Sequence, residues 1–316
     1  MQDFIFSINV TLPIFLVMVV GWGLKQIGML DDHFVNVANK FNFRVTLPCM
    51  LFYDIATVDI REVFDLKFVL FCALVSTVCF WGIWGLTRLL VKDTSIRGAF
   101  VQASFRSSAA VMGLAFISNI YGSSPMGPLM VIGAVPLYNV YSVIVLTFEA
   151  EGEDGKRDTA KIKQAFINIA KNPIILSILL GVVFAVLGVR LPVVATKTIS
   201  SLAQLATPLA LVVIGAGFEG RKAIKKIKPT AVGTFIKLVG LTAVFLPVAV
   251  MMGFRNQELM AILIMLASPS TVTCFVMAKS MNNDYVLSSS IVVLTTFLSS
   301  ITLTGWIFLL RSFGLI

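Results

Sequence analysis

The stretch LPIFLVMVVGWGLKQIG, residues 12–28, decides the fold of this chain, because its pattern returns 160 residues later as NPIILSILLGVVFAVLG, residues 172–188. Proline and glycine matches carry most of the weight, since leucine and isoleucine coincide by chance in any apolar sequence. Four such pairs share this offset: Pro13 with Pro173, Gly21 with Gly181, Gly28 with Gly188, and Pro48 with Pro208. A repeat of this length predicts two halves with the same fold.

The composition is typical of an integral membrane protein. Of the 316 residues, 58% are hydrophobic and 13% are charged, whereas a soluble domain is nearer to about 45–50% apolar and about 25% charged. The net charge of +9 would suggest nucleic acid in a soluble protein. Here the cations gather in short connections and at the ends of apolar stretches, so we expect a lipid bilayer and no nucleic acid as the partner.

Ten stretches are long enough to cross a bilayer, which takes about 20 mostly apolar residues. We therefore expect an all-α polytopic membrane protein with ten transmembrane helices. The first half of the second span is polar and is expected to face protein or water. The predicted spans are 10–29, 36–57, 67–91, 97–120, 127–149, 171–190, 194–218, 229–252, 257–280 and 285–311.

Lysine and arginine predict the orientation of these spans. Most of the 25 such residues belong to the connections after spans 1, 3, 5, 7 and 9 or to the span ends beside them. The positive-inside rule then places these connections in the cytoplasm and both termini outside a cell membrane. The longest connection, EAEGEDGKRDTAKIKQ (149–164), is expected to be a solvated linker, with a segment that binds a partner as the alternative.

Five spans in each half make the repeat an inverted one, because an odd number of crossings starts the second half from the opposite side. The halves are residues 1–149 and 171–316, with a cytoplasmic linker at 150–170. Inverted repeats are typical of secondary transporters, in which broken helices meet near the middle of the bilayer. The offset places SFRSSAA (104–110) of span 4 opposite IMLASPS (264–270) of span 9. Pro269 should break span 9, and the run of serine and alanine with Gly113 should break span 4.

Four motifs, in this order and spacing, resemble the auxin efflux carrier family, which includes bacterial permeases for dicarboxylates such as malonate and malate and the plant PIN auxin exporters. The motifs are LPCMLF (47–52), NPII (172–175), ATPLALVVIGAGF (206–218) and ASPSTVTCFVMAKSM (267–281). The resemblance implies a scaffold from spans 1, 2, 6 and 7 and a transport domain from spans 3–5 and 8–10. It also implies homodimers, elevator-type motion and unwound spans 4 and 9 that cross.

The chain departs from the family pattern at span 4. Arg106, Ser107 and Ser108 stand where many members carry an asparagine and a proline. Span 5 keeps Tyr141, where PIN-type carriers have a tyrosine near their site, and Asn139 lies close to it in the sequence.

Arg106 is the strongest candidate for binding a substrate, because an arginine at the bilayer centre costs at least about 2.5–3.5 kcal/mol. Its planar guanidinium matches a carboxylate, so we expect an anion anchor. The alternative is a structural arginine that caps carbonyls of a broken helix or pairs with an acid elsewhere. Carboxylates are nearly absent from the spans, being confined to the ends of spans 2, 5 and 9, which favours an anionic substrate.

The other candidate site residues surround the predicted crossing, and small hydroxyl residues also occur there simply because they let helices approach closely. Lys237 in span 8 is expected to extend its ammonium toward an interface, with a role in substrate or ion coupling as the alternative. The candidates besides Arg106 are Ser104, Ser107, Ser108, Asn139, Tyr141, Ser268, Pro269, Ser270 and Thr271.

These features predict a secondary transporter, or permease, of small organic anions, with mono- or dicarboxylates as the expected substrates, working by alternating access. We expect no cofactor, no metal site and no enzymatic activity; a proton or sodium ion is a possible coupling ion. The four cysteines lie in apolar runs without CxxC spacing, and the only histidine, His33, lies in a connection. Two alternatives remain: a sodium-coupled symporter of the bile-acid type, and a membrane sensor that binds an anion without moving it.

Overall fold

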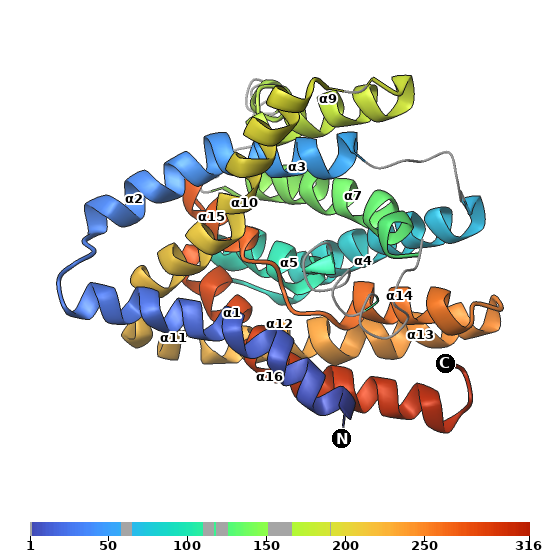
Figure 1. Ribbon diagram of the computed structural model, residues 1–316. Helices are drawn as coiled ribbons and strands as arrows, with labels where there is room; N and C mark the ends of the chain where they lie inside the picture. The colour runs from blue at the N-terminus through green and yellow to red at the C-terminus, as the bar shows by residue number, and fades with distance from the viewer. Residues whose placement is uncertain (1, 58–64, 110–116, 118–125, 151–165, 190) are drawn as a thin grey trace.

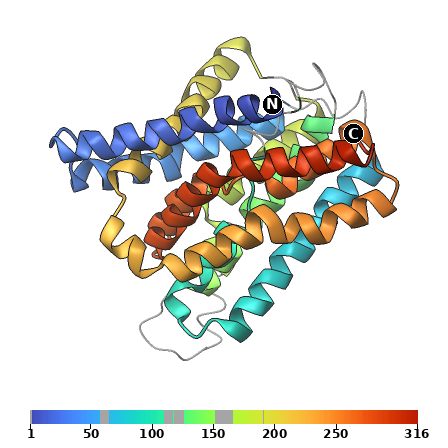
Figure 2. The same ribbon diagram turned by 90° about the horizontal axis from the view of Figure 1, so that it is seen from below.

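The computed structural model describes residues 2–57, 65–109, 117, 126–150, 166–189 and 191–316. Across these ranges the chain is helical, and no strand occurs in them. Long helices pack side by side in a bundle, and the two chain ends lie on the same side of it (Figures 1 and 2). The ten predicted crossings would place the two ends on the same side in this way.

The first half contains a helix interrupted by a wide turn and a helix that stops short. The second predicted span is α2 and α3 joined by a π-helical turn, and the fourth begins with a single 3₁₀ turn (Thr94–Ile96) followed by only nine residues of α-helix. The helices are α1 (Gln2–Gln26), α2 (Asp32–Phe41), the π turn η1 (Asn42–Thr46), α3 (Leu47–Ala56), α4 (Leu66–Leu90), α5 (Arg97–Phe105) and α7 (Met126–Phe148).

The second half also contains a π-helical turn and a broken helix. The broken ninth span corresponds to the fourth in the repeat, whereas the eighth span corresponds to the third, which has no π turn. A π-helical turn interrupts the eighth predicted span, and the ninth is divided into two helices. The elements are α9 (Pro173–Leu187), α10 (Val193–Ala216), α11 (Gly220–Lys225), α12 (Ile227–Phe235), the π turn η4 (Ile236–Gly240), α13 (Leu241–Met251), α14 (Asn256–Ala267), α15 (Thr273–Ser280) and α16 (Tyr285–Ser312).

Five helical stretches are long and apolar enough to cross a membrane: Leu66–Leu90, Met126–Phe148, Val193–Ala216, Ile227–Met251 and Tyr285–Ser312. They coincide with predicted spans 3, 5, 7, 8 and 10. Three shorter apolar helices, Leu12–Gln26, Pro173–Leu187 and Asn256–Ala267, fall in predicted spans 1, 6 and 9. Most of the second half of span 4 and most of the linker at 150–170 lie outside the described residues, so the full set of ten spans stays a prediction.

Side-chain caps fix where several of these helices begin. Asp31, Asp65 and Asp284 accept hydrogen bonds from backbone N–H groups in the first turns of α2, α4 and α16. Asn172 does the same for α9, which ends at Gly188 in the left-handed conformation (φ 65°). Each such cap stabilises a helix by about 0.5–2 kcal/mol, so these boundaries follow from local sequence.

The first half of the chain packs against the second half: α1 packs on α10, and α3 packs on α9 (Figure 1). A Cβ atom added to Gly21 of α1 would lie 2.3 Å from the carbonyl oxygen of Val212, and one added to Gly181 of α9 would lie 3.2 Å from that of Phe52. The two contacts are related by the repeat: Gly21 and Gly181 are 160 residues apart, and so are Phe52 and Val212. Gly21 and Gly181 of the repeat are therefore places where two helices approach closely enough to exclude a side chain.

The connections divide between the two ends of the bundle. At one end Lys226 pairs with Asp284, and the Asn283 amide donates to the Leu146 carbonyl at 2.9 Å. These contacts join the connections after predicted spans 5, 7 and 9. At the other end the Lys67 ammonium donates to the Met252 carbonyl at 2.8 Å. Successive helices therefore run in alternate directions.

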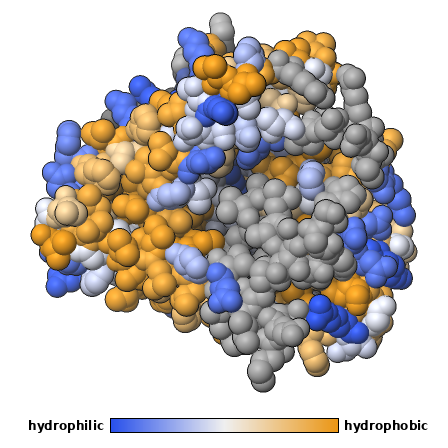
Figure 3. Space-filling view, viewed as in Figure 1, coloured by the Kyte–Doolittle hydropathy of each residue, from blue (hydrophilic) through white to orange (hydrophobic). Residues whose placement is uncertain are grey.

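The outer surface is largely apolar. Figure 3 shows a wide hydrophobic region over the left part of the view, with hydrophilic side chains toward its margins. Exposed leucine, valine, tryptophan and phenylalanine side chains lie along α1, α4, α9 and α16. A water-soluble protein rarely exposes so much contiguous apolar surface, which fits a surface that faces lipid.

Candidate functional site: a polar cavity at two broken helices

Two helices stop in the centre of the bundle, at the places that the repeat predicts. The α5 helix ends at Phe105 and α14 ends at Ala267, and the next residues, Arg106 (φ −70°, ψ 146°) and Ser268 (φ −67°, ψ 154°), have nearly the same extended backbone. The Ser108 N–H donates to the Pro269 carbonyl at 2.9 Å. The two breaks are therefore joined directly through their main chains.

The break in span 9 leaves backbone groups without helical partners, and side chains from other helices take them up. Pro269 has no N–H to offer the Met265 carbonyl, which accepts the Tyr138 hydroxyl at 3.4 Å. The freed Ser270 N–H donates to the Thr295 hydroxyl at 3.1 Å. Buried backbone groups without hydrogen-bond partners are costly. Because side chains of α7 and α16 supply these partners, they lower the free-energy cost of the break.

Lys237 takes up the third freed group. Its ammonium donates to the Leu266 carbonyl in the last turn of α14, and its side chain is fully buried. The expectation that Lys237 reaches toward an interface is therefore wrong. The residue lies in the π turn η4 of span 8, and its positive charge sits at the C-terminal end of a helix, where the helix dipole favours it.

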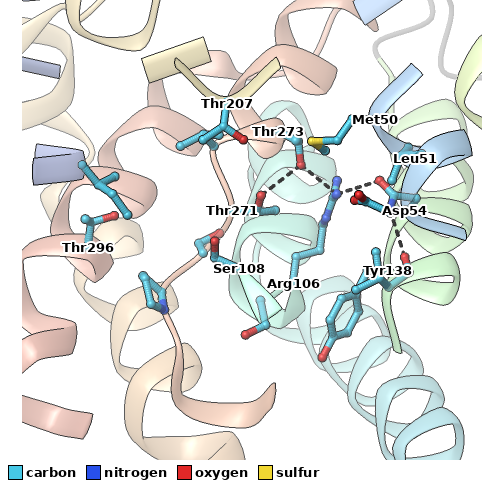
Figure 4. A pocket seen from close by; sticks show the side chains of 17 residues that line it. Met50, Leu51, Asp54, Arg106, Ser108, Tyr138, Thr207, Thr271, Thr273 and Thr296 are labelled. Atoms are coloured by element: carbon cyan, nitrogen blue, oxygen red, sulfur yellow. Dashed lines mark hydrogen bonds between the residues drawn. The ribbon is translucent and has the colours of Figure 1, made fainter. Parts of the chain in front are cut away.

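Arg106 begins the break in span 4, and its guanidinium is buried, with 3% of the residue exposed. One terminal nitrogen donates to the Asn139 amide oxygen and the Thr273 hydroxyl, both at 2.8 Å, and the other contacts the Met277 sulfur at 2.8 Å (Figure 4). Its Nε has no partner in the described structure. No acid lies within 4.0 Å of it there. Among the described residues its side chain is therefore held by neutral groups, with no carbonyl capped and no acid in direct contact.

Arg106 lines a cavity formed by seven of the ten predicted site residues. The cavity lies between the two breaks and helices α1, α3, α7, α10 and α16. The start of α15 also faces it, so the positive end of that helix dipole adds to the potential of the guanidinium. The predicted residues that line it are Arg106, Ser107, Ser108, Asn139, Pro269, Ser270 and Thr271.

Three predicted residues do not line the cavity. Ser268 is fully buried and its hydroxyl bonds that of Ser107, so it supports the site from behind. Ser104 is buried against Gly233 of α12, where its oxygen would be 2.9 Å from an added Cβ. The Tyr141 hydroxyl bonds Thr77 at 3.0 Å, and its ring stacks on Phe80.

Several lining residues were not predicted. Thr273 bonds Arg106 and follows Pro269 by four residues, so the motif itself pointed to it. Asp54 was noticed only as an acid near the end of span 2. The remaining residues come from spans whose rotation the sequence does not reveal: Ile14, Met50, Leu51, Val135, Tyr138, Thr207, Val272 and Thr296.

A sequence model of the family described as membrane transport protein matches residues 6–307. The chain belongs to this family. It is the auxin efflux carrier family that the motifs indicated, and the protein is thus a membrane transporter built from apolar helices.

Named relatives share most of the length of this transporter. An uncharacterized transporter, YfdV, of Escherichia coli strain K12 is 24% identical over 283 residues, covering 88% of this chain and 89% of the relative. A putative malonate transporter of Rhizobium meliloti (strain 1021) is 26% identical over 280 residues, covering 87% and 86%. An uncharacterized transporter of Methanothermobacter thermautotrophicus is 21% identical over 306 residues, covering 96% and 98%.

Proposed function

We propose that this transporter carries small organic anions, with mono- or dicarboxylates as the substrate class, through the cavity between the two breaks. One observation carries the proposal. The buried guanidinium of Arg106 lines this cavity, and within the described residues it has no acid within 4.0 Å. A buried charge without a counter-ion in direct contact is unfavourable, so an anion that enters the cavity gains a favourable partner.

The surroundings suit a carboxylate better than other ligands. Ser108, Thr207, Thr271 and Thr296 bring hydroxyl groups to the cavity, and the unpartnered Nε of Arg106 leaves one guanidinium donor unused. A carboxylate matches the geometry of guanidinium donors. The relative from Rhizobium meliloti, named a putative malonate transporter, supports a carboxylate as the substrate.

For the mechanism we propose elevator-type alternating access. The scaffold would consist of spans 1, 2, 6 and 7, because α1 packs on α10 and α3 packs on α9 through matching glycine contacts. The transport domain would hold spans 3–5 and 8–10 with both breaks. The family resemblance implies homodimers, so we propose a homodimer joined through the scaffold, in the cell membrane with both termini outside. The driving force would be the membrane potential or a coupled proton or sodium ion.

The test is uptake of labelled mono- and dicarboxylates into proteoliposomes, with Arg106→Gln and Arg106→Lys beside the wild type. Arg221→Gln is the matched control, since Arg221 lies exposed on α11. We expect both Arg106 variants to lose affinity, and the control to transport normally. Unchanged affinity in Arg106→Gln would refute the anchor. Dependence on a sodium gradient would support the bile-acid type, and tight binding without flux would support a sensor.

A further inference from the structure

A carboxylate faces the same cavity as Arg106. Asp54, in the last turns of α3, lines the cavity and is half-buried (Figure 4). Among the lining residues Asp54 is the acid and Arg106 the base, and every other lining side chain is uncharged. A ligand in the cavity therefore meets one fixed charge of each sign.

The two charges do not neutralise each other by direct contact. The terminal nitrogens of Arg106 donate to Asn139, Thr273 and Met277. The carboxylate of Asp54 has no hydrogen bond or ion pair in the part of the chain that the structure describes. Both groups are thus free to interact with a ligand.

Among the described residues, helices α7, α9 and α10 bring no other strong charge close to Asp54, and Arg44 of the adjoining π turn η1 is exposed. The sequence of α9, which packs on α3, has no titratable side chain, and α7 brings only the phenols of Tyr138 and Tyr141. On α10 the one charged residue is Lys197, close to the start of the helix and far along it from Thr207, which lines the cavity. Among the described residues, Arg106 is therefore the other charged group that shares the cavity with Asp54.

We infer that Asp54 sets the charge selectivity of the anion site: a carboxylate binds at Arg106, and a second negative charge on the same ligand is disfavoured. This inference rests on the proposed function. At an effective dielectric constant of about 20, two unit charges several ångströms apart change affinity by roughly tenfold or more. Asp54 therefore favours a ligand whose far end is neutral or carries an ammonium group, such as a monocarboxylate or a zwitterionic amino acid, over a dianion.

Three acids with the same three-carbon skeleton test this. Propionate ends in a methyl group, β-alanine in an ammonium group and malonate in a second carboxylate. Binding of each to the purified full-length protein is measured by calorimetry at about pH 8, well above the ordinary titration range of an aspartate. In the wild type we expect malonate to bind most weakly. Asp54→Asn should strengthen malonate binding about tenfold relative to propionate and weaken that of β-alanine.

Asp54→Glu is the matched control, because it keeps the charge and should keep the wild-type order. Equal changes for all three ligands in Asp54→Asn, or no change, would overturn the inference. A wild type that binds malonate more tightly than propionate would overturn it without any variant. Failure of the proposed function looks different: Arg106→Gln would then leave binding of all three acids unchanged, or the wild type would bind no acid in a wider panel, and the inference would fall with it.

Discussion

The two breaks at the centre of this transporter have similar backbones and different roles. The break in span 9 contains Pro269, and its freed groups are taken up by Tyr138, Lys237 and Thr295 from three other helices. The break in span 4 has no proline in residues 106–108 and begins at Arg106, whose side chain lines the cavity. Side chains of neighbouring helices thus stabilise the break in span 9, whereas the break in span 4 places a positive charge at the cavity.

The comparison separates the two buried cations of the site. Both Arg106 and Lys237 lie inside the bundle, and both are next to a break. Lys237 donates to a backbone carbonyl and does not line the cavity, whereas Arg106 donates to side chains and does line it. An intramembrane charge is therefore not by itself evidence of a ligand contact; the partner of each charge decides its role.

The largest expected effect concerns these two cations and tests whether Arg106 binds the anion while Lys237 does not. Arg106→Gln should weaken anion binding by about 100-fold, since charged hydrogen bonds contribute about 1.5–3 kcal/mol. Lys237→Met should change affinity by less than about threefold and slow transport, because the Leu266 carbonyl loses its donor. Binding isotherms and initial rates of uptake, measured on both variants, separate the two effects. Equal losses of affinity would show that both cations hold the anion.

A second test asks how closely the two halves match where helices touch. Gly21→Ala should destabilise the protein by about 2 kcal/mol, because its Cβ would meet backbone atoms of Val212. Gly181→Ala, its partner in the repeat, should cost less, since the nearest atom is 3.1 Å away. Gly23→Ala on α1 is the control: nothing lies within 4 Å of its Cβ. Thermal unfolding in detergent gives the three shifts, and a loss as large in Gly23→Ala would refute the close-contact explanation.

The smallest expected effect concerns the hydroxyl pair that joins the breaks. Ser107→Ala and Ser268→Ala should each cost about 1 kcal/mol of stability, and a double-mutant cycle should give a coupling of about 0.5–1.5 kcal/mol. Ser107 lines the cavity and Ser268 does not, so Ser107→Ala alone should also weaken anion binding. Equal effects on binding would mean that the two breaks contribute alike to the site.

Local sequence predicted the helices well because their signals are local. Apolar length located the spans, and the capping residues Asp31, Asp65, Asn172 and Asp284, which the structure places at helix starts, also act through bonds to their own first turns. Pro269 marked the break in span 9, since a ring that removes an N–H has the same consequence in any fold.

Prediction was weaker where a side chain's direction depends on helix rotation. Lys237 was expected to extend toward an interface, but the π turn around it changes the helical register and turns its ammonium to α14. Tyr141 points to Thr77 rather than to the cavity, one turn away from Tyr138, which does line it.

The sequence by itself determined that this protein is a helical membrane transporter of the auxin efflux carrier family. It also identified Arg106 as a charged residue within an apolar span and therefore as a candidate site residue. Composition, repeat and motif order are properties of the chain alone. Only the tertiary structure decided that Asp54 of span 2, Thr207 of span 7 and Thr296 of span 10 share a cavity with Arg106. Packing sets the rotation of each helix about its axis, and packing depends on residues far apart in the chain.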